Sequence, residues 1–111
     1  MVTITEDIIH EITVRIVEQA DPDKVVLFGS CTAGKIGRDS DVDLLIVEKR
    51  PFGSGNSRYK EIGRLMRALR DVPVPVDLLV FSREEVEKWR TTTNHIVRIA
   101  LREGKTLYER T

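Results

Sequence analysis

Residues 25–47 of the chain read VVLFGSCTAGKIGRDSDVDLLIV, and this stretch decides the fold. The β-branched and aromatic run 25–28 predicts a short buried strand that ends at Gly29. A second apolar run, 42–47, predicts a neighbouring strand. Segment 30–40 is rich in glycine, serine, threonine and charge, which favours a loop. Because this loop leaves one strand and returns into its neighbour, we expect its two ends to meet at one edge of a sheet.

The rest of the chain predicts helices that alternate with strands. Apolar residues at helical spacing mark one face on each of three helices, and the face of the last helix is expected to be buried. The three sets are Ile9, Ile12, Ile16 and Ala20; Ile62, Leu65, Met66 and Leu69; Ile96, Val97, Ala100 and Leu101. Capping residues are predicted at Thr3 with Glu6, at Ser82 with Glu85, and at Asn94 or a preceding threonine. Gly104 stands where a C-terminal helix glycine is expected. Segments 76–81 and 106–108 predict a third strand and an edge strand.

Composition limits the class of protein. The 111 residues are 41% hydrophobic and 32% charged, which predicts a single globular domain over 1–111. The formal net charge is zero, so direct binding of nucleic acid through many phosphate contacts is not expected. No apolar run approaches the length of a membrane span. The single Cys31 fits a reducing compartment, and we expect a cytoplasmic location.

Three aspartates stand in or beside apolar strands, where aspartate is depleted. Asp41 and Asp43 flank Val42, and residues two apart in a strand point to the same face, roughly 6–7 Å apart at the backbone. Asp77 repeats the anomaly within the strand 76–81. Like charges this close repel, so a compensating positive charge is expected. Magnesium is a candidate, because it prefers hard oxygen ligands and commonly bridges carboxylates to phosphates.

Purely structural roles for these residues stay open as alternatives. The Asp41/Asp43 pair could cap a turn at the strand entry, and Asp77 could form a salt bridge with an arginine or lysine. Gly29-Ser30 could be an ordinary turn after a strand. Alternatively, glycine lets the backbone approach a ligand, and amide N–H groups with a serine hydroxyl suit phosphate oxygens.

Two other known motifs match this part of the sequence only in part, and we reject both. Segment 29–35 fits the first seven places of a Walker A loop, yet Ile36 stands where Ser or Thr should bind magnesium, and the loop lacks a following helix. Segment 39–43 resembles the opening of an EF-hand calcium loop. The glycine and the glutamate of that loop are replaced by Leu44 and Arg50.

The pattern as a whole resembles the DNA polymerase β-like nucleotidyltransferases, and most of all their minimal nucleotidyltransferase (MNT) branch. Segments 27–30 and 41–44 match the GSx10DxD signature of that superfamily. Segment 76–79 looks like the strand of the third carboxylate. The closing segment 100–109 is similar to the usual end of such proteins.

The resemblance implies a fold, a reaction and roles for residues. It implies an α+β fold, with a mixed β-sheet and flanking helices as in the polymerase β-like palm. It implies ATP as substrate, two Mg²⁺ ions, and transfer of a nucleoside monophosphate to a hydroxyl. Gly29 and Ser30 would hold the triphosphate, Asp41 and Asp43 would ligate the metals, and Asp77 would ligate one metal and help to deprotonate the acceptor.

The resemblance also implies a partner. Many prokaryotic MNT proteins are antitoxins, of the type VII-like class, paired with a helical HEPN toxin to which they add AMP on a tyrosine. A non-catalytic antitoxin that acts by contact and a small-molecule nucleotidyltransferase are the alternatives. Segment 31–34 lacks the two arginines often found after Gly-Ser, so Lys35 or Arg38 would meet the phosphate charge. The arginines 64, 67 and 70 are typical of a solvated helix face.

Overall fold

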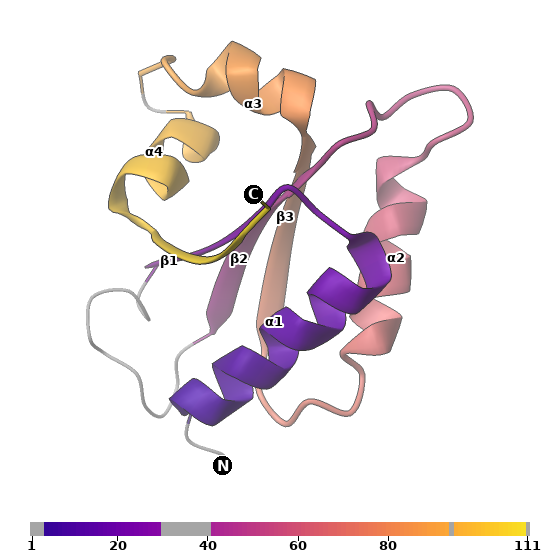
Figure 1. The fold of residues 1–111 in the computed structure, drawn as a ribbon, viewed down its shortest axis with the longest axis vertical. Coiled ribbons are helices and arrows are strands. Elements are labelled where there is room, and N and C mark those ends of the chain that lie inside the picture. Colours follow the sequence, from indigo (N-terminus) through magenta and orange to yellow (C-terminus); the bar gives the residue numbers. More distant parts are fainter. Residues whose placement is uncertain (1–3, 30–40, 94, 111) are drawn as a thin grey trace.

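The computed structural model describes residues 4–29, 41–93 and 95–110. These ranges form four helices and four strands, and the α+β class expected from the sequence is confirmed (Figure 1). In chain order the elements are α1 (Glu6–Ala20), β1 (Lys24–Phe28), β2 (Val42–Glu48), α2 (Arg58–Ala68), β3 (Val76–Ser82), α3 (Arg83–Trp89), α4 (Ile96–Glu103) and β4 (Lys105–Glu109). No helix in the described ranges is both long enough and apolar enough to cross a bilayer.

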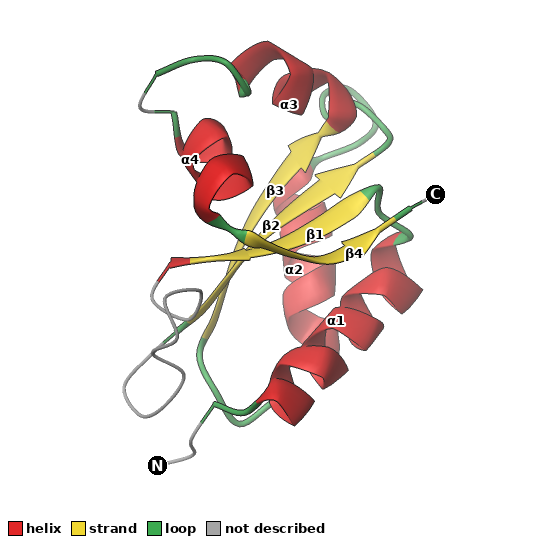
Figure 2. Ribbon diagram, turned by 60° about the vertical axis from the view of Figure 1, so that its left-hand side comes forward, coloured by secondary structure: helices red, strands yellow, loops and turns green. Residues whose placement is uncertain are grey.

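The four strands form one mixed sheet in the order β3-β2-β1-β4. Strand β1 is antiparallel to both β2 and β4, whereas β2 and β3 run parallel. Helices α1 and α2 cover one face of the sheet, and α3 and α4 cover the other (Figure 2). The parallel pair needs a crossover connection, and α2 supplies it.

The core has two layers because side chains of the central strands alternate between the two faces of the sheet. One layer packs against α1 and α2, and its strand residues include Val25, Leu27, Leu44 and Ile46. The other packs against α3 and α4, and its strand residues are Val26, Leu45 and Val47. Strand β2 is therefore buried on both faces, which explains why it reads as a continuous apolar run after its aspartate.

Several local predictions need correction. The N-cap of α1 is Thr5, whose hydroxyl accepts a hydrogen bond from the Ile8 amide, while Thr3 lies outside the described residues. Helix α4 is capped by the His95 ring, which accepts from the Val97 amide; Asn94 also lies outside the described residues. Ile96, expected on the buried face of the last helix, is 38% exposed, and Met66, grouped with Leu65 on one helix face, is 39% exposed. The capping box of Ser82 with Glu85 is confirmed.

Arg58 joins the start of α2 to the end of β3 and the start of α3. Its guanidinium donates to the Val80 carbonyl at 2.7 Å and forms an ion pair with both carboxylate oxygens of Glu85. The same group lies over the rings of Phe52 and Phe81, with 4.9 and 5.3 Å from its central carbon to the ring centroids. These contacts cover a carbonyl of edge strand β3 and fix the end of that strand opposite Asp77.

Gly104 ends α4 for a reason that the sequence did not indicate. Its φ of −83° lies outside the left-handed region, so its backbone does not require glycine. A Cβ atom built on Gly104 would lie 2.4 Å from the Ala100 carbonyl oxygen and 2.5 Å from a methyl carbon of Val26. Glycine is needed because the chain passes against the sheet at this point.

We expect Gly104→Ala to lower the free energy of unfolding by about 2 kcal/mol, because neither the helix nor the sheet can yield to the added methyl. Gly63→Ala in α2 is the control. A Cβ atom there meets only the end of the Arg67 side chain at 3.5 Å. This second change should raise stability by about 0.5–1 kcal/mol through helix propensity. Urea denaturation measures both; equal stability of Gly104→Ala and the parent would contradict the packing argument.

Candidate active site

The pairing of β2 with β3 places two of the three aspartates side by side. In the parallel register Asp43 is the partner of Asp77, so their backbones are about 4.8 Å apart across the sheet. The two carboxyl groups are close enough for a hydrogen bond. Asp41 directly precedes β2 and is exposed, as is Asp77, whereas Asp43 is half-buried. The three residues therefore gather at one end of the central strands.

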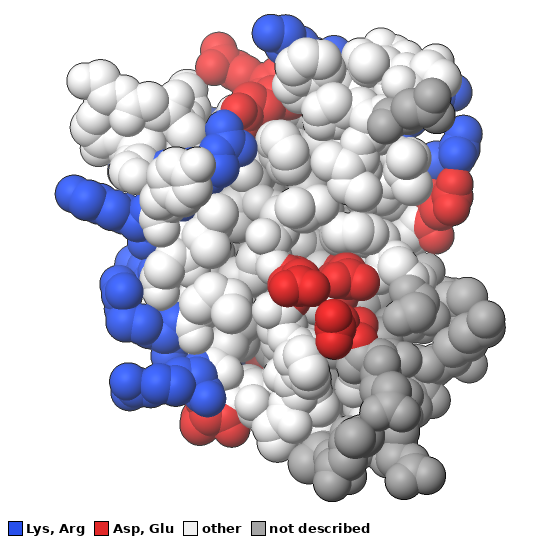
Figure 3. Space-filling view, turned by 180° about the vertical axis from the view of Figure 1, so that it is seen from behind, with Lys and Arg blue, Asp and Glu red and all other residues white. Residues whose placement is uncertain are grey.

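The crowding of these carboxylates shifts the pKa of Asp43. Its pKa is raised above the ordinary value, first by burial, then by the charges of Asp77 and Asp41 and by the hydrogen bond with Asp77. A compact group of acidic side chains is visible on this side of the molecule (Figure 3). Among the described residues, no lysine or arginine forms an ion pair with Asp43 or Asp77. The salt-bridge interpretation of Asp77 thus finds no support within the described chain.

Gly29 lies against the same cluster. Strand β1 pairs with β2 so that Phe28 is opposite Asp43, and Gly29 follows with a φ of +81°, in the left-handed region. A Cβ atom at Gly29 would lie 2.4 Å from the Asp43 Oδ2 atom. Glycine is required here twice, for its backbone conformation and for its close approach to the carboxylate. The loop that begins at Gly29 therefore starts beside the acidic cluster.

Not every residue proposed from the sequence can be placed. Ser30, Lys35 and Arg38, the other candidates for nucleotide binding, lie outside the described residues. Within the described ranges, no group of three or more His, Cys, Asp or Glu side chains forms a ready-made metal site. This is compatible with magnesium, which commonly takes one or two carboxylates and completes its shell with water and substrate phosphates. Asp43 and Asp77, crowded and without a described cation, fit that role.

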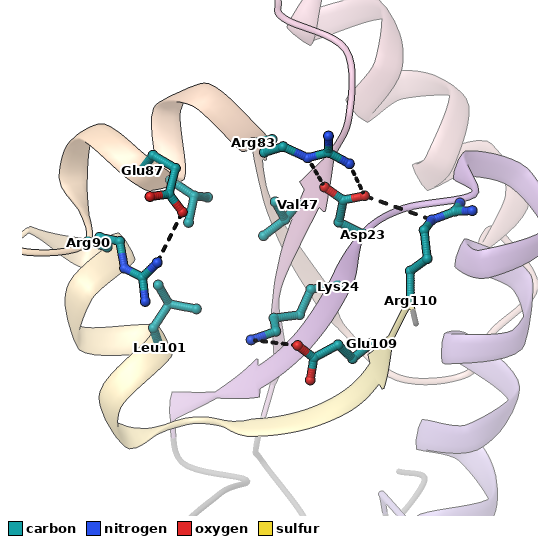
Figure 4. Close-up of a pocket in the computed structure, with 10 residues that line it drawn as sticks. Asp23, Lys24, Val47, Arg83, Glu87, Arg90, Leu101, Glu109 and Arg110 are labelled. Atoms are coloured by element: carbon teal, nitrogen blue, oxygen red, sulfur yellow. Dashed lines mark hydrogen bonds and ion pairs between the residues drawn. The ribbon is translucent and has the colours of Figure 1, made fainter.

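A cavity of about 440 Å³ lies at the other end of the sheet and was not foreseen (Figure 4). It opens between the start of β1, the end of β4 and helices α3 and α4. Its lining residues are Asp23, Lys24, Val47, Arg83, Val86, Glu87, Arg90, Leu101, Glu109 and Arg110. Lys24 is four residues along β1 from Phe28, about 13 Å from the partner of Asp43. The cavity is therefore separate from the acidic cluster.

Ion pairs between elements form the walls of this cavity. Arg83 donates two hydrogen bonds to Asp23, at 2.6 and 2.8 Å, which ties the start of α3 to the start of β1. Lys24 pairs with Glu109 across β1 and β4 at 3.6 Å. These contacts are structural ties, and no sequence motif announces them because they join residues from distant elements.

Comparison with known families identifies the class of protein. The family of nucleotidyltransferase domains matches the chain over residues 10–107. The chain belongs to this family. Its members generally use a nucleoside triphosphate and a divalent metal ion. A search of curated proteins gave no significant match.

Two solved structures share the fold. A candidate nucleotidyltransferase from Sulfolobus solfataricus is 21% identical, with a TM-score of 0.60 over 94% of this chain and 79% of that one. A toxin-antitoxin structure with AMP-PNP is 20% identical, with a TM-score of 0.56 over 92% of this chain and 74% of that one. At such identities the likeness establishes the fold.

Asp43→Asn should stabilise the metal-free protein while it removes a ligand. The pKa of Asp43 is raised on folding, so the folded state binds this proton more tightly than the unfolded state. Its cost to stability therefore develops as the pH rises from about 4, the unfolded value, through the folded pKa. At pH 8 the variant should be more stable than the parent, and the gain should vanish below pH 4.

Thermal unfolding with and without Mg²⁺ and AMP-PNP measures both effects. The parent should gain stability from the ligands, because they bind the folded state, and Asp43→Asn should gain none. Asp7→Asn, at an exposed position in α1, is the matched control and should respond like the parent. An Asp43→Asn protein that is less stable at pH 8, or that gains as much from the ligands, would contradict this assignment.

Proposed function

We propose that the protein is a magnesium-dependent nucleotidyltransferase that transfers AMP from ATP to a hydroxyl of a HEPN toxin. The acceptor that we propose is a tyrosine hydroxyl. In this role it is the antitoxin of a type VII-like toxin–antitoxin pair of the MNT branch. The observation that carries the proposal is the meeting of Asp43, Asp77 and Gly29 at one end of the sheet. The nucleotidyltransferase family match and a structural neighbour from a toxin–antitoxin system support it.

The three carboxylates have two kinds of role in the proposed reaction. Asp41 and Asp43 would hold the metal ions, whose charge would offset that of the triphosphate and of the departing pyrophosphate. Asp77 would ligate one metal and help to deprotonate the acceptor hydroxyl. The hydroxyl oxygen then bonds to the α-phosphorus while the bond from that phosphorus to the bridging oxygen breaks, and pyrophosphate leaves.

The loop after β1 holds the nucleotide in this proposal. Gly29 brings the backbone close to Asp43, so a phosphate bound by the following amide groups and by Ser30 would lie beside the metal ligands. Lys35 and Arg38 supply the positive charge that the missing arginines of segment 31–34 would otherwise provide. Asp77 stands exposed on edge strand β3, where a large partner can approach it.

A contact-only antitoxin is the second candidate. The observation that favours it is segment 31–34, which lacks both loop arginines. A slow or inactive enzyme would keep the fold and the partner surface, and it would neutralise the toxin by covering it.

Intact-mass analysis of the partner separates the candidates. The protein is incubated with Mg-ATP and a HEPN toxin, and the toxin should gain the mass of one adenylyl group or more. Asp41→Asn with Asp43→Asn should abolish this gain, because both metal ligands become neutral amides. Glu18→Gln with Glu84→Gln, two exposed glutamates outside the cluster, should transfer AMP like the parent.

The same samples are assayed for ribonuclease activity of the partner. Under the enzymatic proposal the Asp41→Asn/Asp43→Asn protein no longer neutralises the toxin by modification. If that variant neutralises the toxin as well as the parent, and the partner's mass does not change, the contact-only function is correct and the enzymatic one is wrong.

A further inference from the structure

The outer face of α2 exposes two large apolar side chains in one line. Tyr59 is 86% exposed and Met66 is 39% exposed, and they are two of the three large hydrophobic residues exposed in the described chain. A separation of seven residues places both on the same line of a helix, with Gly63 between them. The opposite side of α2 buries Leu65 in the core. This line is thus apolar surface that the domain itself does not use.

Three cations flank this line without an ion-pair partner among the described residues. They are Lys60, Arg67 and Arg70, the last just beyond the end of α2. The other two arginines of the helix are engaged: Arg58 pairs with Glu85, and Arg64 pairs with Glu61. Basic side chains line the edge of the molecule that α2 forms (Figure 3). We call Tyr59, Gly63, Met66 and these three cations the α2 face.

The composition of the α2 face suits a protein partner. Tyrosine, methionine and arginine are enriched at protein interfaces, and lone apolar side chains flanked by cations favour an amphipathic helix with acidic flanks. A second copy of this chain would bring like charges together, which is unfavourable. The α2 face offers three cations that form no ion pair among the described residues, which is few for nucleic acid, whose affinity depends on many neutralised phosphates.

The α2 face lies on the same side of the molecule as the acidic cluster. Both are seen in one view, with uncharged surface between the basic edge and the group of carboxylates (Figure 3). The chain also runs from the end of α2 into β3, the strand that carries Asp77. A partner seated on α2 would therefore present its surface next to the carboxylates.

We propose that the α2 face docks an acidic amphipathic helix of the protein that supplies the acceptor hydroxyl. The proposal rests on the proposed function for the identity of that protein. Tyr59 and Met66 contact the apolar side of the docked helix, and Arg67 and Arg70 pair with its carboxylates. Docking holds the acceptor hydroxyl near Asp77.

Charge reversal tests the surface, with the HEPN toxin of the proposed function as probe. Arg67→Glu with Arg70→Glu should weaken binding in calorimetry by at least about tenfold, because repulsion replaces attraction. Arg102→Glu with Lys105→Glu makes the same change in charge at exposed positions on α4 and on β4, at the other edge of the sheet from β3, and should leave the affinity within about twofold although Arg102 pairs with Glu103. Tyr59→Ala with Met66→Ala should also weaken binding and should keep its salt dependence.

A compensating change on the partner makes the test specific. The acidic segment of the partner is located by a photo-cross-linking residue placed at position 59, and two of its carboxylates are changed to arginine. This partner should bind the Arg67→Glu/Arg70→Glu protein more tightly than it binds the parent. Cross-links to a basic or non-helical segment would overturn the proposal.

The remaining outcomes separate this proposal from the proposed function. If the parent binds the partner through the α2 face but transfers no AMP, docking stands and the enzymatic function fails. If AMP is transferred and the Arg67→Glu/Arg70→Glu protein binds and transfers normally, the function stands and the docking proposal fails. Absence of binding by the parent would also overturn the docking proposal. So would a result in which the Arg67→Glu/Arg70→Glu change weakens binding to a single-stranded RNA but leaves binding to the protein partner unchanged.

Discussion

The parallel pairing of β2 with β3 is the constraint on which the candidate site depends. Asp43 and Asp77 are brought together only because each strand is held in a register that leaves them opposite one another. Strand β2 is buried on both faces, and a slip by one residue would turn its apolar side chains to the wrong layer. The packing of the sheet therefore holds two carboxylates at a separation that they would not adopt in water. Gly29 completes the arrangement, because no other residue could approach Asp43 so closely.

Crowded carboxylates alone do not define such a site. At the other end of β2, the pKa of Glu48 is raised to about 8 by burial and by its hydrogen bond and charge interaction with Glu61. There, however, Arg64 binds both oxygens of Glu61 at 2.9 Å, and the cation is part of the fold. Asp43 and Asp77 have no such cation among the described residues, and they lie beside a glycine loop. We therefore interpret the Glu48/Glu61 pair as structural and the Asp43/Asp77 pair as a site for metal and phosphate.

Much of the fold could be predicted from the sequence, since short β-branched runs and helical apolar spacing are local signals. The aspartates were also visible, because a charge within segment 76–81 contradicts the strand around it. The differences between prediction and structure concern residues whose surroundings depend on tertiary contacts. Periodicity placed Ile96 on a buried face and Met66 on the apolar face of α2, but both are partly exposed because each helix is covered on one side only. The close passage that requires Gly104 involves strand β1. The 440 Å³ cavity joins residues from both ends of the chain, and no local pattern could indicate it.

The central claim is that the carboxylates at the ends of β2 and β3 hold a divalent cation together with a nucleotide. The most direct measurement is anomalous X-ray diffraction from crystals grown with Mn²⁺ and AMP-PNP, since manganese occupies magnesium sites and scatters anomalously. The account predicts a manganese peak between the carboxyl groups of Asp43 and Asp77, in contact with the phosphates. A bound nucleotide without such a peak, or a manganese ion bound only elsewhere, would contradict it.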